Sequence, residues 1–139
     1  MFDVALASAG SQVVLATSHD DKHPPEHIID GNTDTFWVTT GMFPQEFIVT
    51  FTKMMSMKNI ELSTHNVRKL CIERSVQHDP VDFEPLKEIE LDSSEGQLQM
   101  GSADVGSVTA VHLRVVIESG YDHFVSVHKL HVDGAAVPN

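Results

Sequence analysis

Short runs in which apolar and polar residues alternate are the feature of this sequence that most restricts its fold. Within residues 108–119, for instance, Val111, Leu113, Val115 and Ile117 occupy every second position. Side chains two positions apart lie on the same face of a β-strand, so each run predicts a strand with one buried face. Such runs, separated by turn residues, occur at 4–8, 12–18, 46–52, 59–64, 67–75, 88–91, 97–100, 108–119 and 124–134. The pattern predicts an all-β protein, an antiparallel jelly-roll β-sandwich.

Length and composition indicate one folded unit. The chain has 139 residues, and 41% of them are apolar, which is enough for a core. We expect a single domain over 1–134, with one helical turn at 24–29, and a C-terminal tail over 135–139. The sequence contains no run of about 18 apolar residues, its N-terminus lacks a basic region, and Cys71 is its one cysteine. These features favour an intracellular protein that does not insert into a membrane.

Charge restricts the classes of partner. The formal net charge is -11, and the basic residues are scattered along the chain. Binding to nucleic acid or to an anionic membrane surface requires clustered lysine and arginine. The composition therefore excludes nucleic acid as the expected partner and favours other proteins.

Residues 23–37, HPPEHIIDGNTDTFW, combine oxygen donors with a flexible turn. Asp30, Asn32, Asp34 and Thr35 offer hard oxygens at close spacing, and Gly31 permits a sharp bend. Hard oxygens suit calcium, although the spacing is not that of an EF-hand loop. The alternative is a turn in which these side chains bond to their own backbone. The spacing alone leaves both interpretations open.

Other candidate sites carry weaker signals. His19, His23 and His27 are four residues apart, but two prolines interrupt the helix that would bring them to one face. His128 and His131 are three residues apart, so on a strand their side chains should point to opposite faces and would not share a metal ion. The chain has no nucleophile elbow and no phosphate-binding loop, so we expect a protein without catalytic residues.

Trp37, the one tryptophan, allows two interpretations. It is either a core anchor at the entrance to the sheet or an aromatic platform for a sugar. Aromatic residues make up only 6% of the chain, which favours the core anchor. Cys71 has no basic neighbour in the sequence that would activate it, so we expect a packed thiol.

Residues 27–51 resemble the opening of galactose-binding-like β-sandwich domains of the discoidin type. That superfamily carries the signature (A/N)-x-x-D-G-(N/D)-x-x-T-x-W followed by an apolar strand, and 124–134 resemble its closing strand. HPPE at 23–26 and TTGMFPQEF at 39–47 further resemble the heat shock protein beta-11 family, the small β-sandwich subunits of the intraflagellar transport B complex. The resemblance implies a discoidin-type jelly roll without enzymatic activity.

The same resemblance implies partners and a place in the cell. Members of this family form a heterodimer with a Rab-like small GTPase subunit, intraflagellar transport protein 27, and join other subunits of the transport complex. They are expected in the cilium or flagellum and in the cytoplasm near the basal body. The alternative is a calcium-braced, glycan-binding discoidin module. Scarce aromatics and an unpaired cysteine disfavour that alternative.

The resemblance also implies a structural calcium ion. Its ligands would be the backbone carbonyl of His27, the carboxylate of Asp30, the carbonyl of Asn32, and the hydroxyl and carbonyl of Thr35. A carbonyl near His128 would complete the set. Where the superfamily often has a glutamate, this chain has Lys129. The loss of an anionic ligand predicts weaker calcium binding.

No motif marks the surface that binds a partner. Strands with apolar residues on an outer face are the candidates. They are Val116 beside Arg114, or Val125 and Val127 beside Lys129. Met42 and Phe43, in a turn with Gly41 and Pro44, either contact a partner or cap one end of the sandwich.

Overall fold

The computed structural model describes residues 2–94 and 96–138. They form an eight-stranded antiparallel sheet with two short 3₁₀ helices. The strands are β1 (Phe2–Asp3), β2 (Gln12–Ala16), β3 (Trp37–Val38), β4 (Gln45–His65), β5 (Val67–Ser75), β6 (Glu84–Glu90), β7 (Gln99–Gly120) and β8 (Ser126–Ala136). The helices are η1 (Ala7–Ala9) and η2 (Pro25–Ile29). No helix within the described residues is long and apolar enough to cross a membrane.

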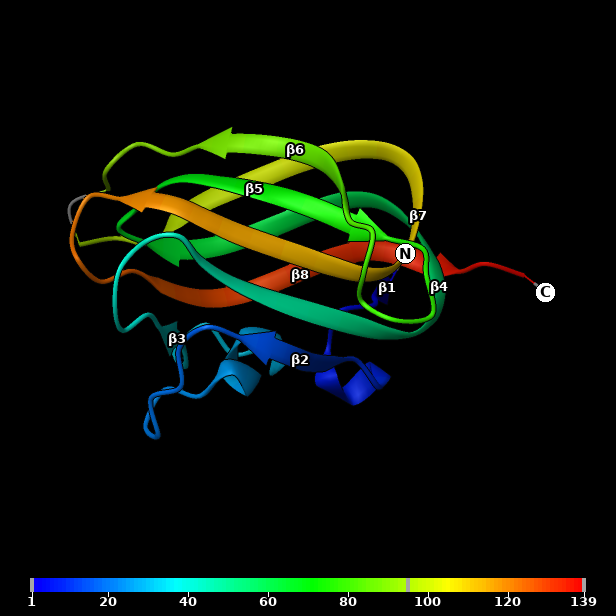
Figure 1. The fold of residues 1–139 in the computed structure, drawn as a ribbon, viewed down its shortest axis with the longest axis horizontal. Coiled ribbons are helices and arrows are strands. Elements are labelled where there is room, and N and C mark those ends of the chain that lie inside the picture. Colours follow the sequence, from blue (N-terminus) through cyan, green and yellow to red (C-terminus); the bar gives the residue numbers. More distant parts are fainter. Residues whose placement is uncertain (1, 95, 139) are drawn as a thin grey trace.

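Two long strands, β4 and β7, belong to both layers of a sandwich (Figure 1). Residues 45–50 pair with 112–117, and residues 55–64 pair with 99–110. Between these stretches the register shifts, because the strands bend from one layer into the other. The front layer holds β2, the first part of β4, the end of β7, β5 and β6, and the back layer holds β1, β3, β8 and the remaining parts. The expected antiparallel jelly-roll sandwich is confirmed.

The core lies between the two layers. Its largest fully buried side chains include Trp37, Phe47, Leu113 and Leu130. Leu113, Val115 and Ile117 are buried as the alternation predicts, but Val111 is only partly buried. The β4–β7 register passes from Ala110 to His112 without it, because β7 bends there and the alternation changes phase.

The ends of the chain differ from the sequence-based expectation. Residues 4–8 are not a strand, because the chain turns after Asp3, buries Val4 and Ala5, and then forms η1. At the other end, β8 extends two residues beyond the expected domain end at 134 and pairs Ala136 with Met55. The runs at 46–52 and 59–64 are parts of the single strand β4.

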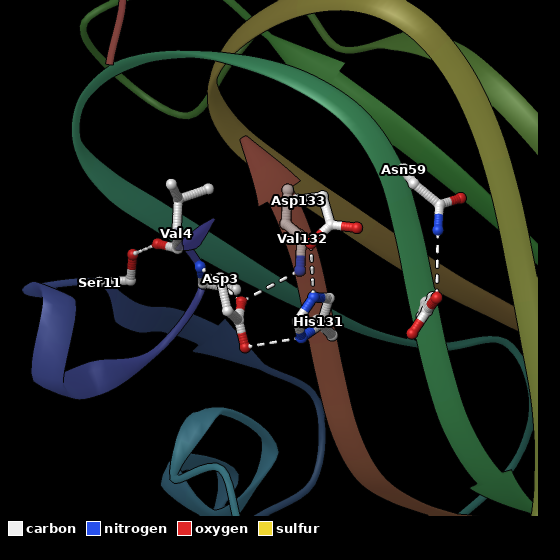
Figure 2. A network of polar contacts seen from close by, with 9 residues as sticks. Asp3, Val4, Ser11, Asn59, His131, Val132 and Asp133 are labelled. Atoms are coloured by element: carbon white, nitrogen blue, oxygen red, sulfur yellow. Dashed lines mark hydrogen bonds and ion pairs between the residues drawn. The ribbon is translucent and has the colours of Figure 1, made fainter. Parts of the chain in front are cut away.

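A polar network fastens β1 to β8 (Figure 2). The carboxylate of Asp3 accepts the backbone N–H groups of Ala5 (3.1 Å) and Val132 (3.0 Å). Its second oxygen lies 3.2 Å from Nδ1 of His131, and Nε2 of the same ring lies 2.8 Å from Asp133. A two-residue strand gains little from its own ladder, so this nearly buried carboxylate fixes its position.

Candidate functional site

The candidate loop begins at η2 and ends at Trp37. Pro25 opens the short helix, where its missing N–H is not needed. The helix ends at Asp30, and Gly31 follows with φ of +78°, a conformation that favours glycine. The predicted sharp bend is therefore present, and it turns the next residues back toward Asp30.

Three of the predicted ligand residues meet in this loop. Oγ1 of Thr35 lies 2.5 Å from a carboxylate oxygen of Asp30 and 2.9 Å from the backbone carbonyl oxygen of Asn32. The other carboxylate oxygen of Asp30 accepts the N–H of Asn32 at 3.0 Å. The N–H of Asp34 donates to the side-chain oxygen of Asn32 at 2.9 Å. Asx turns therefore build the loop and bring three oxygens of different residues together.

His27 lies at the start of the loop, with its ring beside the loop's end. Its N–H donates to the carbonyl of Pro24 at 3.1 Å, and its Nδ1 lies 3.3 Å from the carbonyl oxygen of Phe36. The ring therefore spans the two ends of the loop. The imidazole, which the sequence interpretation did not use, contributes to loop closure.

The side chain of His128 reaches the loop from β8. Its Nδ1 lies 2.9 Å from the carbonyl oxygen of Thr33, and the ring stacks on Phe36 at 4.8 Å between ring centres. The ring of His23 stacks on Phe36 at 4.0 Å. The β4–β8 pairing passes from Val127 to Lys129 and skips His128. This bulge frees the residue to face the loop rather than β4.

The same bulge corrects two expectations. Val125 and Val127 are buried before it, and Leu130 and Val132 are buried after it, so the alternation changes phase. Val125 and Val127 belong to the core and not to a partner-facing surface. His128 and His131 both lie on the outward side of β8, although each contacts different groups. The sequence carries no signal for the extra residue.

The remaining candidates have structural roles. Trp37 is fully buried, donates its indole N–H to the carbonyl of Ser18 at 2.9 Å and meets Phe47 edge-on. The core-anchor interpretation is confirmed, and a sugar platform is not. Burial, followed by the negative charge of Glu73, raises the pKa of the Cys71 thiol. Such a thiol is a poor nucleophile at neutral pH.

The oxygen cluster fits a hard cation better than a soft one. Asp30 supplies a carboxylate oxygen, Asn32 a carbonyl oxygen and Thr35 a hydroxyl oxygen, the donor types that calcium takes. Within the residues that the structure describes, no three His, Cys, Asp or Glu side chains gather as a metal-binding group. A cation here would therefore depend on backbone and hydroxyl oxygens, with little negative charge.

Beside the loop, the surface carries exposed apolar side chains, of which the sequence had singled out Met42. A hollow of about 380 Å³ is lined by Phe36, Leu98, Phe124 and His128, and Phe124 is 56% exposed. A second hollow, of about 330 Å³, shares Asp122 with the first and adds further loop residues. Exposed Tyr121 and Phe124 lie on the loop between β7 and β8, and exposed Met42 lies on the loop between β3 and β4. Val116, by contrast, is partly buried on the outer face of the front layer.

Solved structures define the class of fold. The chain is similar to a carbohydrate-binding module from Clostridium perfringens in complex with GalNAc-β-1,3-galactose, with 21% identity, 92% and 98% of the two chains covered and a TM-score of 0.79. A C-terminal chitobiase domain from Bacteroides fragilis matches with 22% identity, 96% and 99% coverage and a TM-score of 0.78. The chain therefore has the β-sandwich fold of these galactose-binding-like domains.

Curated relatives narrow this class to a family. The intraflagellar transport protein 25 homologue of Homo sapiens is 49% identical to the chain, and the match covers 99% of the chain and 95% of the homologue. The homologue of Mus musculus is 46% identical, and the match covers 97% of the chain and 94% of the homologue. Intraflagellar transport protein 25 of Chlamydomonas reinhardtii shares 37% over 96% of the chain and 70% of its own length. No protein-family model matches. The chain belongs to the intraflagellar transport protein 25 family, which associates it with the cilium or flagellum.

Proposed function

We propose that this protein is a non-catalytic subunit of the intraflagellar transport B complex that forms a heterodimer with a Rab-like small GTPase subunit, intraflagellar transport protein 27. The observation that carries the proposal is the similarity to the transport family over nearly the whole length of the chain. As part of that complex, the protein would be present in the cytoplasm near the basal body as well as in the cilium.

The exposed apolar loops support a protein partner. Stable interfaces have an apolar centre inside a polar rim, and aromatic residues are enriched there. Exposed Phe124 lines one hollow and exposed Tyr121 the other, Asp122 lines both, and exposed Met42 precedes Phe43 of the second hollow. Val116 is less accessible, so these loops are the better candidate for the centre of the interface.

Co-purification tests the heterodimer. We expect the chain and the Rab-like GTPase, expressed together, to elute from gel filtration as one species with equal amounts of both. Replacing Phe124 with Asp should weaken the pair at least about tenfold, because central aromatic residues dominate interface energies. Val81→Asp is the matched control, since Val81 is also exposed but lies on the β5–β6 loop, at the end of the sandwich opposite to the β7–β8 loop (Figure 1). Separate elution of the two native chains would contradict the proposal.

We also propose that the loop binds a structural calcium ion. His27, Asp30, Asn32 and Thr35 would hold it, with a carbonyl near His128, and it would brace the entrance to the sandwich. Convergence of the Asp30, Asn32 and Thr35 oxygens supports the proposal. The single carboxylate in this set, together with Lys129 on β8, supports weak binding.

Thermal unfolding tests the calcium proposal. A ligand that binds only the folded chain raises the melting temperature, so calcium should raise that of the native protein by a few degrees relative to chelator. In Asp30→Ala the calcium-dependent increase should disappear. Asp34→Ala is the control, because only the backbone N–H of Asp34 takes part in the loop network. An equal calcium response in native protein and Asp30→Ala would refute the site.

Glycan binding is the second candidate function. The hollow beside Phe124, on a fold that a galactose-bound module shares, is the observation that favours it. A glycan array and a titration with galactose distinguish the two functions. Retention on glycans, combined with no GTPase binding, would favour the module over the transport subunit.

A further inference from the structure

The two edge strands of the front layer differ in how they are protected. β6 carries Pro85 and Lys87 together with three glutamates, Glu84, Glu88 and Glu90. Proline and charged side chains on an edge strand prevent other chains from pairing with it. β2, at the opposite edge, has the sequence Gln-Val-Val-Leu-Ala and carries neither a charge nor a proline.

The outer edge of β2 pairs with no strand of the described residues, although η2 lies beside β2. Within the described residues β2 pairs only with β4, and Figure 1 shows no strand beyond it. The N–H of Thr17 donates to the carbonyl of Glu46 at 3.0 Å. Because backbone groups alternate in direction along an antiparallel pair, those of Ala16 face away from β4. The register skips Val14, which is therefore a bulged residue with no partner in the β2–β4 ladder.

Exposed apolar side chains and the carboxylate of Glu26 lie beside the outer edge of β2. Val14 is 46% exposed and Leu15 is 42% exposed. Two hollows, of about 290 and 430 Å³, lie along β2, and both are lined by Val13 and by Glu26 of η2. His19 also lines the smaller one. Glu26 is exposed and is therefore placed to meet a basic group on whatever occupies the edge.

We propose that β2 is a docking edge for an extended segment of a partner protein in which apolar side chains flank a lysine or arginine. The segment would add a strand to the front layer through the outward backbone groups of β2, insert apolar side chains into the two hollows and place its basic group at Glu26. A second copy of this chain fits poorly, because it would bring two Glu26 carboxylates and two net charges of -11 together. The inference does not depend on the proposed GTPase heterodimer.

Two capped synthetic peptides of alternating threonine and valine are the probes, one with a central lysine and one with a central glutamate. Each is titrated into the full chain and followed by amide NMR. We expect the lysine peptide to shift the signals of Gln12–Ala16 and to bind about tenfold more tightly than the glutamate peptide. No shift within β2 at millimolar lysine peptide would overturn the proposal.

Variants separate edge pairing from general attraction. Leu15→Lys places a charge on the open edge and should weaken binding of the lysine peptide at least about tenfold. Glu26→Lys should reverse the preference so that the glutamate peptide binds better. Val81→Lys is the matched control, because Val81 is also an exposed apolar residue and lies on the loop before β6, and it should leave binding unchanged. If the folded Leu15→Lys variant binds the lysine peptide as tightly as the native chain does, β2 is not the docking edge. The proposal also fails if ultracentrifugation shows that the native chain is a homodimer and that Leu15→Lys dissociates it, because the occupant of the edge would then be a second copy.

Discussion

At the scale of one residue, the surroundings of Cys71 on the sheet change the pKa of its thiol. The thiol lies on β5, partly buried, with acidic side chains around it. Burial and the negative charges of Glu73 and Glu118 disfavour the thiolate, so they raise its pKa. At any pH below that raised pKa, a smaller fraction of the thiol is ionised than in a free cysteine.

Alkylation by iodoacetamide measures this effect. We expect Cys71 in the folded chain to react several-fold more slowly at pH 7.5 than the cysteine of a short unstructured peptide. The rate should continue to rise with pH beyond about 8.5, where a free thiol levels off. The chain unfolded in urea is the control and should react as the free thiol does. Equal rates in the folded and unfolded chains would show that the surroundings of Cys71 do not lower the reactivity of its thiol.

At the scale of the element, β1 depends on a side chain more than on its own ladder. Asp3 accepts two backbone N–H groups and meets His131 while almost entirely buried. Its loss would leave buried donors on Ala5 and Val132 without an acceptor. Asp3→Ala should therefore lower the free energy of unfolding by about 1–3 kcal/mol.

Urea denaturation and hydrogen exchange check this prediction. The amides of Ala5 and Val132 should lose protection in Asp3→Ala, whereas amides in β5 should keep theirs. Asp79→Ala is the control, because Asp79 is exposed and its ion pair with His78 is exposed as well. A similar loss of stability in both variants would contradict a specific anchoring role for Asp3.

At the scale of the whole molecule, β4 and β7 make the two layers one cooperative unit. Each strand takes part in both layers, so neither layer can unfold without breaking the ladder of the other. We expect a single unfolding transition. Trp37 fluorescence, which reports on the core, and far-ultraviolet circular dichroism, which reports on strands, should give the same urea midpoint. Midpoints that differ between the two probes would show that the layers unfold separately.

Local sequence patterns were enough to predict the long strands and the position of the oxygen-rich turn. Alternation within 108–119 is a local property, and so are Asx turns such as that of Asp30, Gly31 and Asn32. A chain segment of a few residues contains everything that these features require. The strand predicted at 4–8 is absent. Val4 and Ala5 are buried there from a turn, so their apolar character did not indicate a strand.

Only the tertiary structure decided which strand neighbours which, and therefore which residues meet. His128 contacts the carbonyl of Thr33 from 95 positions away, and the bulge beside it turns Val125 and Val127 into the core. The same pairing leaves the edge of β2 open while charges and a proline protect β6. Register, bulges and edges arise when distant strands pair, and the local alternation of side chains does not encode that choice.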